Sequence, residues 1–167
     1  RLLAGWKRED GGATRRRPLP WALLKTATRL ARLPAASRKT QTMNALMWLG
    51  YFFLLRPGEY LRTSTGRHPF TISHVFLRIN GVEYSGATIP LHLLNEELVS
   101  FAGFRFDMQK NGVPDEKIGL GRATDPYICP VKAIIRLLRS LRSDPNLPAD
   151  TPLYCYVNEQ GSLLQIT

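Results

Sequence analysis

An arginine closes the most apolar stretch of this chain. Residues 49–55, "LGYFFLL", are followed by Arg56, a Pro-Gly pair and Glu59. The guanidinium of an arginine can donate two parallel hydrogen bonds to the oxygens of a phosphate or a carboxylate, and lysine cannot copy that geometry. A positive charge is also favoured where a helix ends, and an acidic residue where a helix begins. Structural roles for Arg56 and Glu59 are therefore the alternative to a role in chemistry.

Positive charge is concentrated at the start of the chain. The 167 residues carry a net charge of +10, and residues 1–40 hold 11 lysines and arginines against 2 acidic residues, which gives +9. A basic arm before a nearly neutral body is typical of a chain that lies along phosphates, so we predict double-stranded DNA as the partner. A merely soluble basic surface is the alternative. The predicted DNA contacts are Arg15, Arg16, Arg17, Lys25, Arg29, Arg32, Arg38 and Lys39.

Two helices are predicted between residues 20 and 55. In residues 20–33 the basic side chains Lys25, Arg29 and Arg32 share one helical face. The residues on the opposite, apolar face are Leu23, Ala27, Leu30 and Ala31. A second helix, from about residue 37 or 40 to residue 55, is apolar nearly all round in its second half, so we expect it to be central. Pro57 should end this helix at Arg56.

Residues 75–121 change to an alternating pattern. Apolar residues alternate over 75–79, and Asn80-Gly81 is a pair that tight hairpin turns prefer. A second alternating run over 102–108 leads into "QKNG" and predicts a second hairpin, with Lys110 beside its turn. Pro130 then opens a helix with one apolar stripe, made of Val131, Ile134, Ile135, Leu138 and Leu141. We therefore predict an α+β fold, with helices packed around a small antiparallel sheet of two hairpins.

Other signals narrow the class of protein and its organisation. The apolar run at 45–55 is shorter than the roughly 20 residues that a membrane-crossing helix needs. Cys129 and Cys155 are too few and too far apart for a disulfide framework or a Cys-x-x-Cys metal site, so we interpret them as buried thiols. We expect an intracellular protein without a membrane partner, nuclear if the host is eukaryotic. Residues 1–17 have linker composition and could include the end of a preceding helical DNA-binding domain, and 18–167 form the main domain.

Five motifs, in order and spacing, resemble the catalytic domain of tyrosine recombinases, the phage-integrase group. They are "RRRPLP", "LGYFFLLRPGEYL", "FRFDMQKNG", "CPVKAIIRLL" and "TPLYCYVNEQG". The resemblance covers roughly residues 17–167, and "QKNG" with "CPV" is most similar to the versions in Crypton-type mobile elements. It implies DNA recombination or integration by strand cleavage and rejoining through a phosphotyrosine intermediate. It also implies that no metal or nucleotide cofactor is used and that other recombinase protomers are partners.

The resemblance assigns roles to three residues. Arg56 matches the first catalytic arginine, which binds the non-bridging phosphate oxygens as negative charge builds on them. Lys110 matches the hairpin lysine that protonates the leaving 5′-oxygen. A lysine beside a turn has the proton, the reach and the mobility for that task, but it is also an ordinary choice for solubility. Glu59 stands where the family usually has an acidic residue that supports the site.

The chain also departs from the family pattern. In the family, the His-x-x-Arg box and the nucleophilic tyrosine lie beyond the "PLYCYVNEQG" landmark, and Tyr154 and Tyr156 come too early to be the nucleophile. We therefore expect the chain to be the first part of a catalytic domain, truncated at its C-terminus, which binds DNA without cutting it. One alternative is a non-catalytic nucleic-acid-binding or chromatin-associated module in which Arg56 is structural. Another is a degraded mobile-element remnant.

Overall fold

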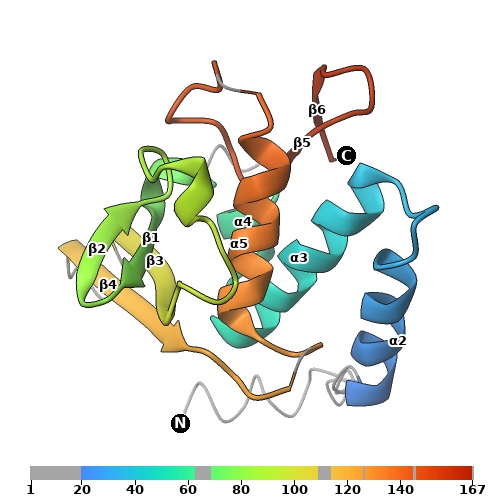
Figure 1. Cartoon of the computed structure of the whole chain (residues 1–167), viewed down its shortest axis with the longest axis horizontal. Coiled ribbons are helices and arrows are strands. Elements are labelled where there is room, and N and C mark those ends of the chain that lie inside the picture. The colour runs from blue at the N-terminus through green and yellow to red at the C-terminus, as the bar shows by residue number, and fades with distance from the viewer. Residues whose placement is uncertain (1–19, 63–68, 109–113, 126, 145, 167) are drawn as a thin grey trace, which may run out of the picture.

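The computed structural model describes residues 20–62, 69–108, 114–125, 127–144 and 146–166, which form the predicted α+β fold. Helices are α2 (Trp21–Ala31), α3 (Arg38–Phe52), α4 (Pro57–Tyr60) and α5 (Pro130–Leu141), with short 3-10 turns η1 (Ile72–His74) and η2 (Leu91–Leu93). Strands are β1 (Val75–Ile79), β2 (Val82–Ser85), β3 (Phe101–Met108), β4 (Pro114–Gly121), β5 (Cys155–Val157) and β6 (Leu163–Gln165). Figure 1 shows α5 and α3 crossing in the centre, with the larger sheet on one side and α2 on the other.

The two predicted hairpins join into one antiparallel sheet. Its strand order is β2-β1-β3-β4, so the first hairpin pairs with the second through β1 and β3. Asn80 and Gly81 have φ angles of 48° and 82°, which a tight two-residue turn requires, and the first hairpin is confirmed. The strands of the second hairpin pair as far as Met108 opposite Pro114. A separate pair, β5 and β6, was not predicted beyond the extended segment at β5.

Helix α5 packs between the sheet and α3 (Figure 1). Pro130 is in its first turn, where the missing N–H costs nothing. All five residues of the predicted stripe are buried, and the helix buries eight of its twelve residues. Helix α3 was predicted to be central but exposes Met43 and Tyr51, so α5 is the more deeply buried of the two.

Helix α3 ends earlier than predicted. After Phe52 the chain turns through Leu54, which has a φ of 51°, and the N–H of Leu55 donates to the carbonyl of Gly50 at 3.2 Å. This is a Schellman-type helix end, in which glycine is the usual residue at the left-handed position. Pro57 therefore does not stop α3 but opens α4.

Helix α2 buries a face that shares only Ala31 with the predicted apolar face. Leu23 and Leu30 are exposed, at 54% and 57%. The residues that the helix buries are Leu24, Thr28 and Ala31. Thr28 can be buried because its hydroxyl is satisfied: it accepts hydrogen bonds from Trp48 Nε1 at 2.7 Å and Asn44 Nδ2 at 3.2 Å. The pattern of apolar residues in the sequence does not predict the hydrogen bonds of Thr28 to Trp48 and Asn44.

The segment before β1 is hydrogen-bonded to the segment just before β5. Thr71 forms an isolated antiparallel bridge with Pro152. The N–H of Leu153 donates to the carbonyl of Phe70 at 2.9 Å. Two segments about 80 residues apart in the sequence are thus hydrogen-bonded to each other.

Both cysteines are buried thiols, as predicted. Cys129 and Cys155 are free and are 3% and 2% exposed. Burial raises the pKa of the Cys155 thiol to about 11, so this thiol stays protonated at neutral pH.

Candidate nucleic-acid interface

The Arg56 turn, residues 53–59, connects α3 to α4. The backbone N–H of Arg56 donates to the Glu59 carboxylate at 2.7 Å, and the N–H of Glu59 donates to the Arg56 carbonyl at 2.8 Å. An acidic side chain that accepts from the residue before the helix is half of a capping box. Glu59 therefore holds the backbone of Arg56, which is the structural role considered for it.

The side chain of Arg56 is exposed. It has no hydrogen bond or ion pair with any residue that the structure describes. A carboxylate paired with Arg56 would compete with a phosphate for the guanidinium. No described residue forms such an ion pair with Arg56. The Arg56 side chain is thus accessible to an anionic ligand.

An aromatic cluster, Phe53, Phe70, Phe104 and Phe106, lies beneath the Arg56 turn. Phe104 is fully buried, and its ring centroid lies 4.9 Å from that of Phe53 and 5.0 Å from that of Phe70. Phe70 also packs edge-on against Phe106, with ring centroids 4.8 Å apart. Because Phe53 belongs to the turn and Phe104 and Phe106 belong to β3, the turn and this strand share one core.

Lys110 belongs to residues 109–113, which lie outside the described residues. The described strand β3 leads from the aromatic cluster to Met108, two residues before Lys110. The Arg56 turn is tied to the same cluster by its backbone, since the N–H of Phe70 donates to the carbonyl of Glu59 at 2.7 Å. The structure therefore joins the turn to the base of the second hairpin and leaves the position of the lysine itself a prediction.

The basic residues of α2 gather against one loop. Lys25 forms an ion pair with Asp125 at 3.3 Å. The guanidinium carbons of Arg29 and Arg32 lie 5.8 Å and 4.5 Å from the ring centroid of Tyr127. A hydrogen bond from the backbone N–H of Tyr127 lowers the pKa of Asp125, with Lys25 contributing further. The three cations do share a face, as predicted, but Lys25 already has a protein carboxylate as its partner.

The other predicted DNA contacts have different outcomes. Arg15, Arg16 and Arg17 lie outside the described residues. Lys39 is half-buried, whereas Arg38, the first residue of α3, is exposed. These positions neither confirm nor contradict the predicted contacts with DNA.

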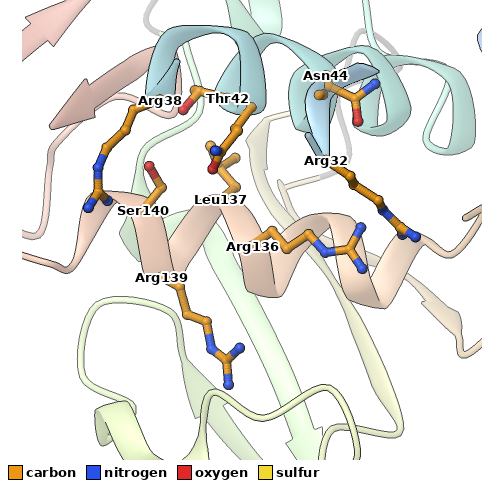
Figure 2. Close-up of a pocket in the computed structure, with 10 residues that line it drawn as sticks. Arg32, Arg38, Thr42, Asn44, Arg136, Leu137, Arg139 and Ser140 are labelled. Carbon is orange, nitrogen blue, oxygen red and sulfur yellow. The ribbon is translucent and has the colours of Figure 1, made fainter. Parts of the chain in front are cut away.

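Arg38 and Arg32 line a pocket with two arginines of α5, Arg136 and Arg139 (Figure 2). We call these four residues and the space between them the arginine pocket. Arg136 and Arg139 are not among the predicted site residues. Their spacing places them away from the apolar stripe of α5, but no signal in the sequence brings them to the start of α3.

Within the described ranges, no helix has both the length and the apolar character needed to cross a membrane. In the same part of the chain, His, Cys, Asp and Glu side chains form no group of three that could hold a metal ion. No family model, curated protein or solved structure matches this chain.

Proposed function

We propose that this chain binds the backbone of double-stranded DNA and supplies Arg56 and Lys110 to an enzyme that cuts and rejoins DNA. The reaction would proceed through a phosphotyrosine intermediate, as the resemblance to tyrosine recombinases implies. The observation that carries the proposal is the aromatic cluster, because it joins the turn that bears Arg56 to the strand that leads to Lys110. One phosphate could then be contacted from both segments.

The exposed guanidinium of Arg56 suits this role. Two parallel hydrogen bonds to non-bridging oxygens would strengthen as negative charge builds on the phosphate, so the arginine would act mainly in the transition state. Lys110 would donate a proton to the leaving oxygen. The +9 charge of residues 1–40 would supply affinity for DNA without reading its sequence.

A non-catalytic nucleic-acid-binding module is the second candidate. It is favoured by the cap at Glu59, because a carboxylate bonded to the backbone of Arg56 needs no catalytic role to explain it. In that case the basic residues would account for the whole function. The two candidates differ in what they require of the Arg56 side chain.

The shared claim of DNA binding is tested by salt dependence. A labelled duplex is titrated at several salt concentrations with the wild type and with a variant in which Arg15, Arg16 and Arg17 are glutamine. Loss of three phosphate contacts should lower the slope of log K against log salt by roughly 2.7. Arg122→Gln removes one charge beside the end of β4, where Arg122 is paired with Glu97, and serves as the control. An unchanged slope in the triple variant would remove the arm from the proposal.

The claim of catalysis is tested in a protein that carries this chain together with a nucleophilic tyrosine. Arg56→Lys should lose DNA cleavage by at least about 100-fold while duplex affinity stays within about twofold. Lys110→Ala should recover cleavage on a substrate whose leaving 5′-oxygen is replaced by sulfur, which needs no proton. Normal cleavage by Arg56→Lys would favour the non-catalytic module instead.

A further inference from the structure

We propose that the arginine pocket is a binding site for a phosphate group, separate from the Arg56 turn. The pocket has a volume of about 370 Å³ and lies between the end of α2, the first half of α3 and the second half of α5. It goes beyond the proposed function, because it does not require the chain to cut DNA. Helix α3 has 15 residues and is therefore about 22 Å long, which separates Arg38 at its start from the Arg56 turn after its end.

The charges around the pocket are unbalanced. Glu96 accepts two hydrogen bonds from Arg136, at 2.9 Å and 3.3 Å, and it also pairs with Lys132 at 3.6 Å. Among the described residues, neither Arg38 nor Arg139 has a carboxylate within ion-pair distance. One carboxylate thus serves two cations, and Arg38 and Arg139 remain without a carboxylate partner among the described residues.

The arginines also crowd one another. Partial burial and the charge of Arg136 lower the pKa of Arg32, and Glu96, Tyr127 and Asp125 offset part of this effect. In Figure 2, Arg32 and Arg136 extend to the same side of the pocket, whereas Arg38 and Arg139 extend outward at its rim. A bound anion would relieve this repulsion, and the two exposed rim side chains can turn toward it by rotamer changes.

Two hydroxyl groups in the pocket lining lack partners. Thr42 Oγ1 and Ser140 Oγ are buried, and neither has a hydrogen-bond partner among the described residues. Both residues line the pocket, Thr42 from α3 and Ser140 from α5. Buried hydroxyls are normally paired, and the oxygen of a bound anion would accept their hydrogen bonds after small side-chain rotations.

These donors match a phosphate better than a carboxylate. Guanidinium groups donate several hydrogen bonds each, and those of Arg38 and Arg139 together with the two hydroxyls exceed what the two oxygens of one carboxylate can accept. The phosphate could be a backbone phosphodiester of DNA or a free phosphate compound of pyrophosphate size. The chemistry of recognition is the same for both.

Calorimetric titration of the full chain with pyrophosphate at low ionic strength tests the site. The wild type should show saturable binding to one site. Arg38→Ala and Arg139→Ala should each weaken it by at least about tenfold, because each removes a charge-assisted donor from an exposed position. Arg122→Ala removes the same charge after β4, outside the pocket, and should change affinity by less than about twofold. No saturable binding by the wild type, or an equal loss in Arg122→Ala, would overturn the proposal.

Duplex DNA distinguishes the two sources of the phosphate. If a DNA phosphate occupies the pocket, pyrophosphate should displace the duplex, and Arg139→Ala should lower the salt slope of duplex binding by about 0.9. If the ligand is a free phosphate compound, Arg139→Ala should lose pyrophosphate binding while duplex affinity is unchanged. Either result supports a phosphate site, and the arm and Arg56 variants test the proposed function independently of it.

Discussion

The Arg56 turn and the arginine pocket position arginines in two different ways. In the turn, one arginine is held by its own neighbours, since Leu54 ends α3 and Glu59 caps α4 within a few residues of it. In the pocket, four arginines from α3, α5 and the end of α2 line one space only because α3 packs against both α2 and α5. The first arrangement is a local property of the chain, and the second is a property of the folded protein. Substitutions can test whether this difference is real.

The largest effect is expected from Phe104→Ala. This change empties the centre of the aromatic cluster that supports the turn, and it should cost about 3–5 kcal/mol in the free energy of unfolding. Urea denaturation followed by circular dichroism measures the loss. Phe101→Ala removes a half-buried ring of the same strand, which contacts Phe76 instead, and should cost less than half as much. Equal losses would mean that the cluster gives the turn no special support.

In the pocket, Thr42→Val should stabilise the protein by about 1 kcal/mol, because it removes a buried hydroxyl that lacks a partner. Thr28→Val is the matched control, one helix away. Its hydroxyl accepts from Trp48 and Asn44, so its loss should destabilise by about 1–3 kcal/mol. Chemical denaturation of both variants gives the two signs. If Thr42→Val destabilises the protein as Thr28→Val does, the Thr42 hydroxyl already has a hydrogen-bond partner and is not available to a ligand.

In the turn, Glu59→Ala should cost about 1 kcal/mol through loss of the cap on Arg56. Glu59→Gln keeps an oxygen that can accept the same backbone hydrogen bond and should retain most of the stability. Thermal unfolding at matched salt compares the two variants. A Gln variant as unstable as the Ala variant would show that the charge of Glu59 matters more than its position.

The smallest effect is expected from Leu54→Gly, which should stabilise by about 0.5–1 kcal/mol. Leu54 has a positive φ of 51° and its side chain is 87% exposed, so glycine relieves strain and removes no packing. Leu54→Ala keeps the strain and should not gain stability. Equal stabilities of the Gly and Ala variants would show that the left-handed conformation is not strained.

The elements whose structure depends on residues adjacent in the sequence could be predicted from local patterns. Asn80-Gly81 specified the first hairpin because few other pairs adopt two positive φ angles, and the apolar stripe of α5 specified its buried face. The end of α3 was wrong because Leu54 takes a conformation for which glycine is the usual signal.

The buried face of α2 and the arginine pocket depend on tertiary contacts, which local sequence patterns do not predict. The buried face of α2 depends on Thr28, which became a core residue only because Trp48 and Asn44 donate to it. The arginine pocket depends in the same way on helix packing. The residues next to Arg136 and Arg139 in the sequence do not predict that these arginines line it. Of the candidate site, Arg56 could be singled out from its neighbours, whereas its accessibility and the role of Glu59 as a cap required the structure.

The pairing of Phe70 with Leu153, together with the bridge from Thr71 to Pro152, sets an order of events during synthesis. Residues 70 and 71 leave the ribosome about 80 residues before their partners, a delay of roughly 4–16 s at about 5–20 residues per second. Throughout that interval Phe70 lacks the hydrogen bond from Leu153. Because the carbonyl of Glu59 accepts the N–H of Phe70, we expect the Arg56 turn to reach its final form only after residue 153 has been synthesised.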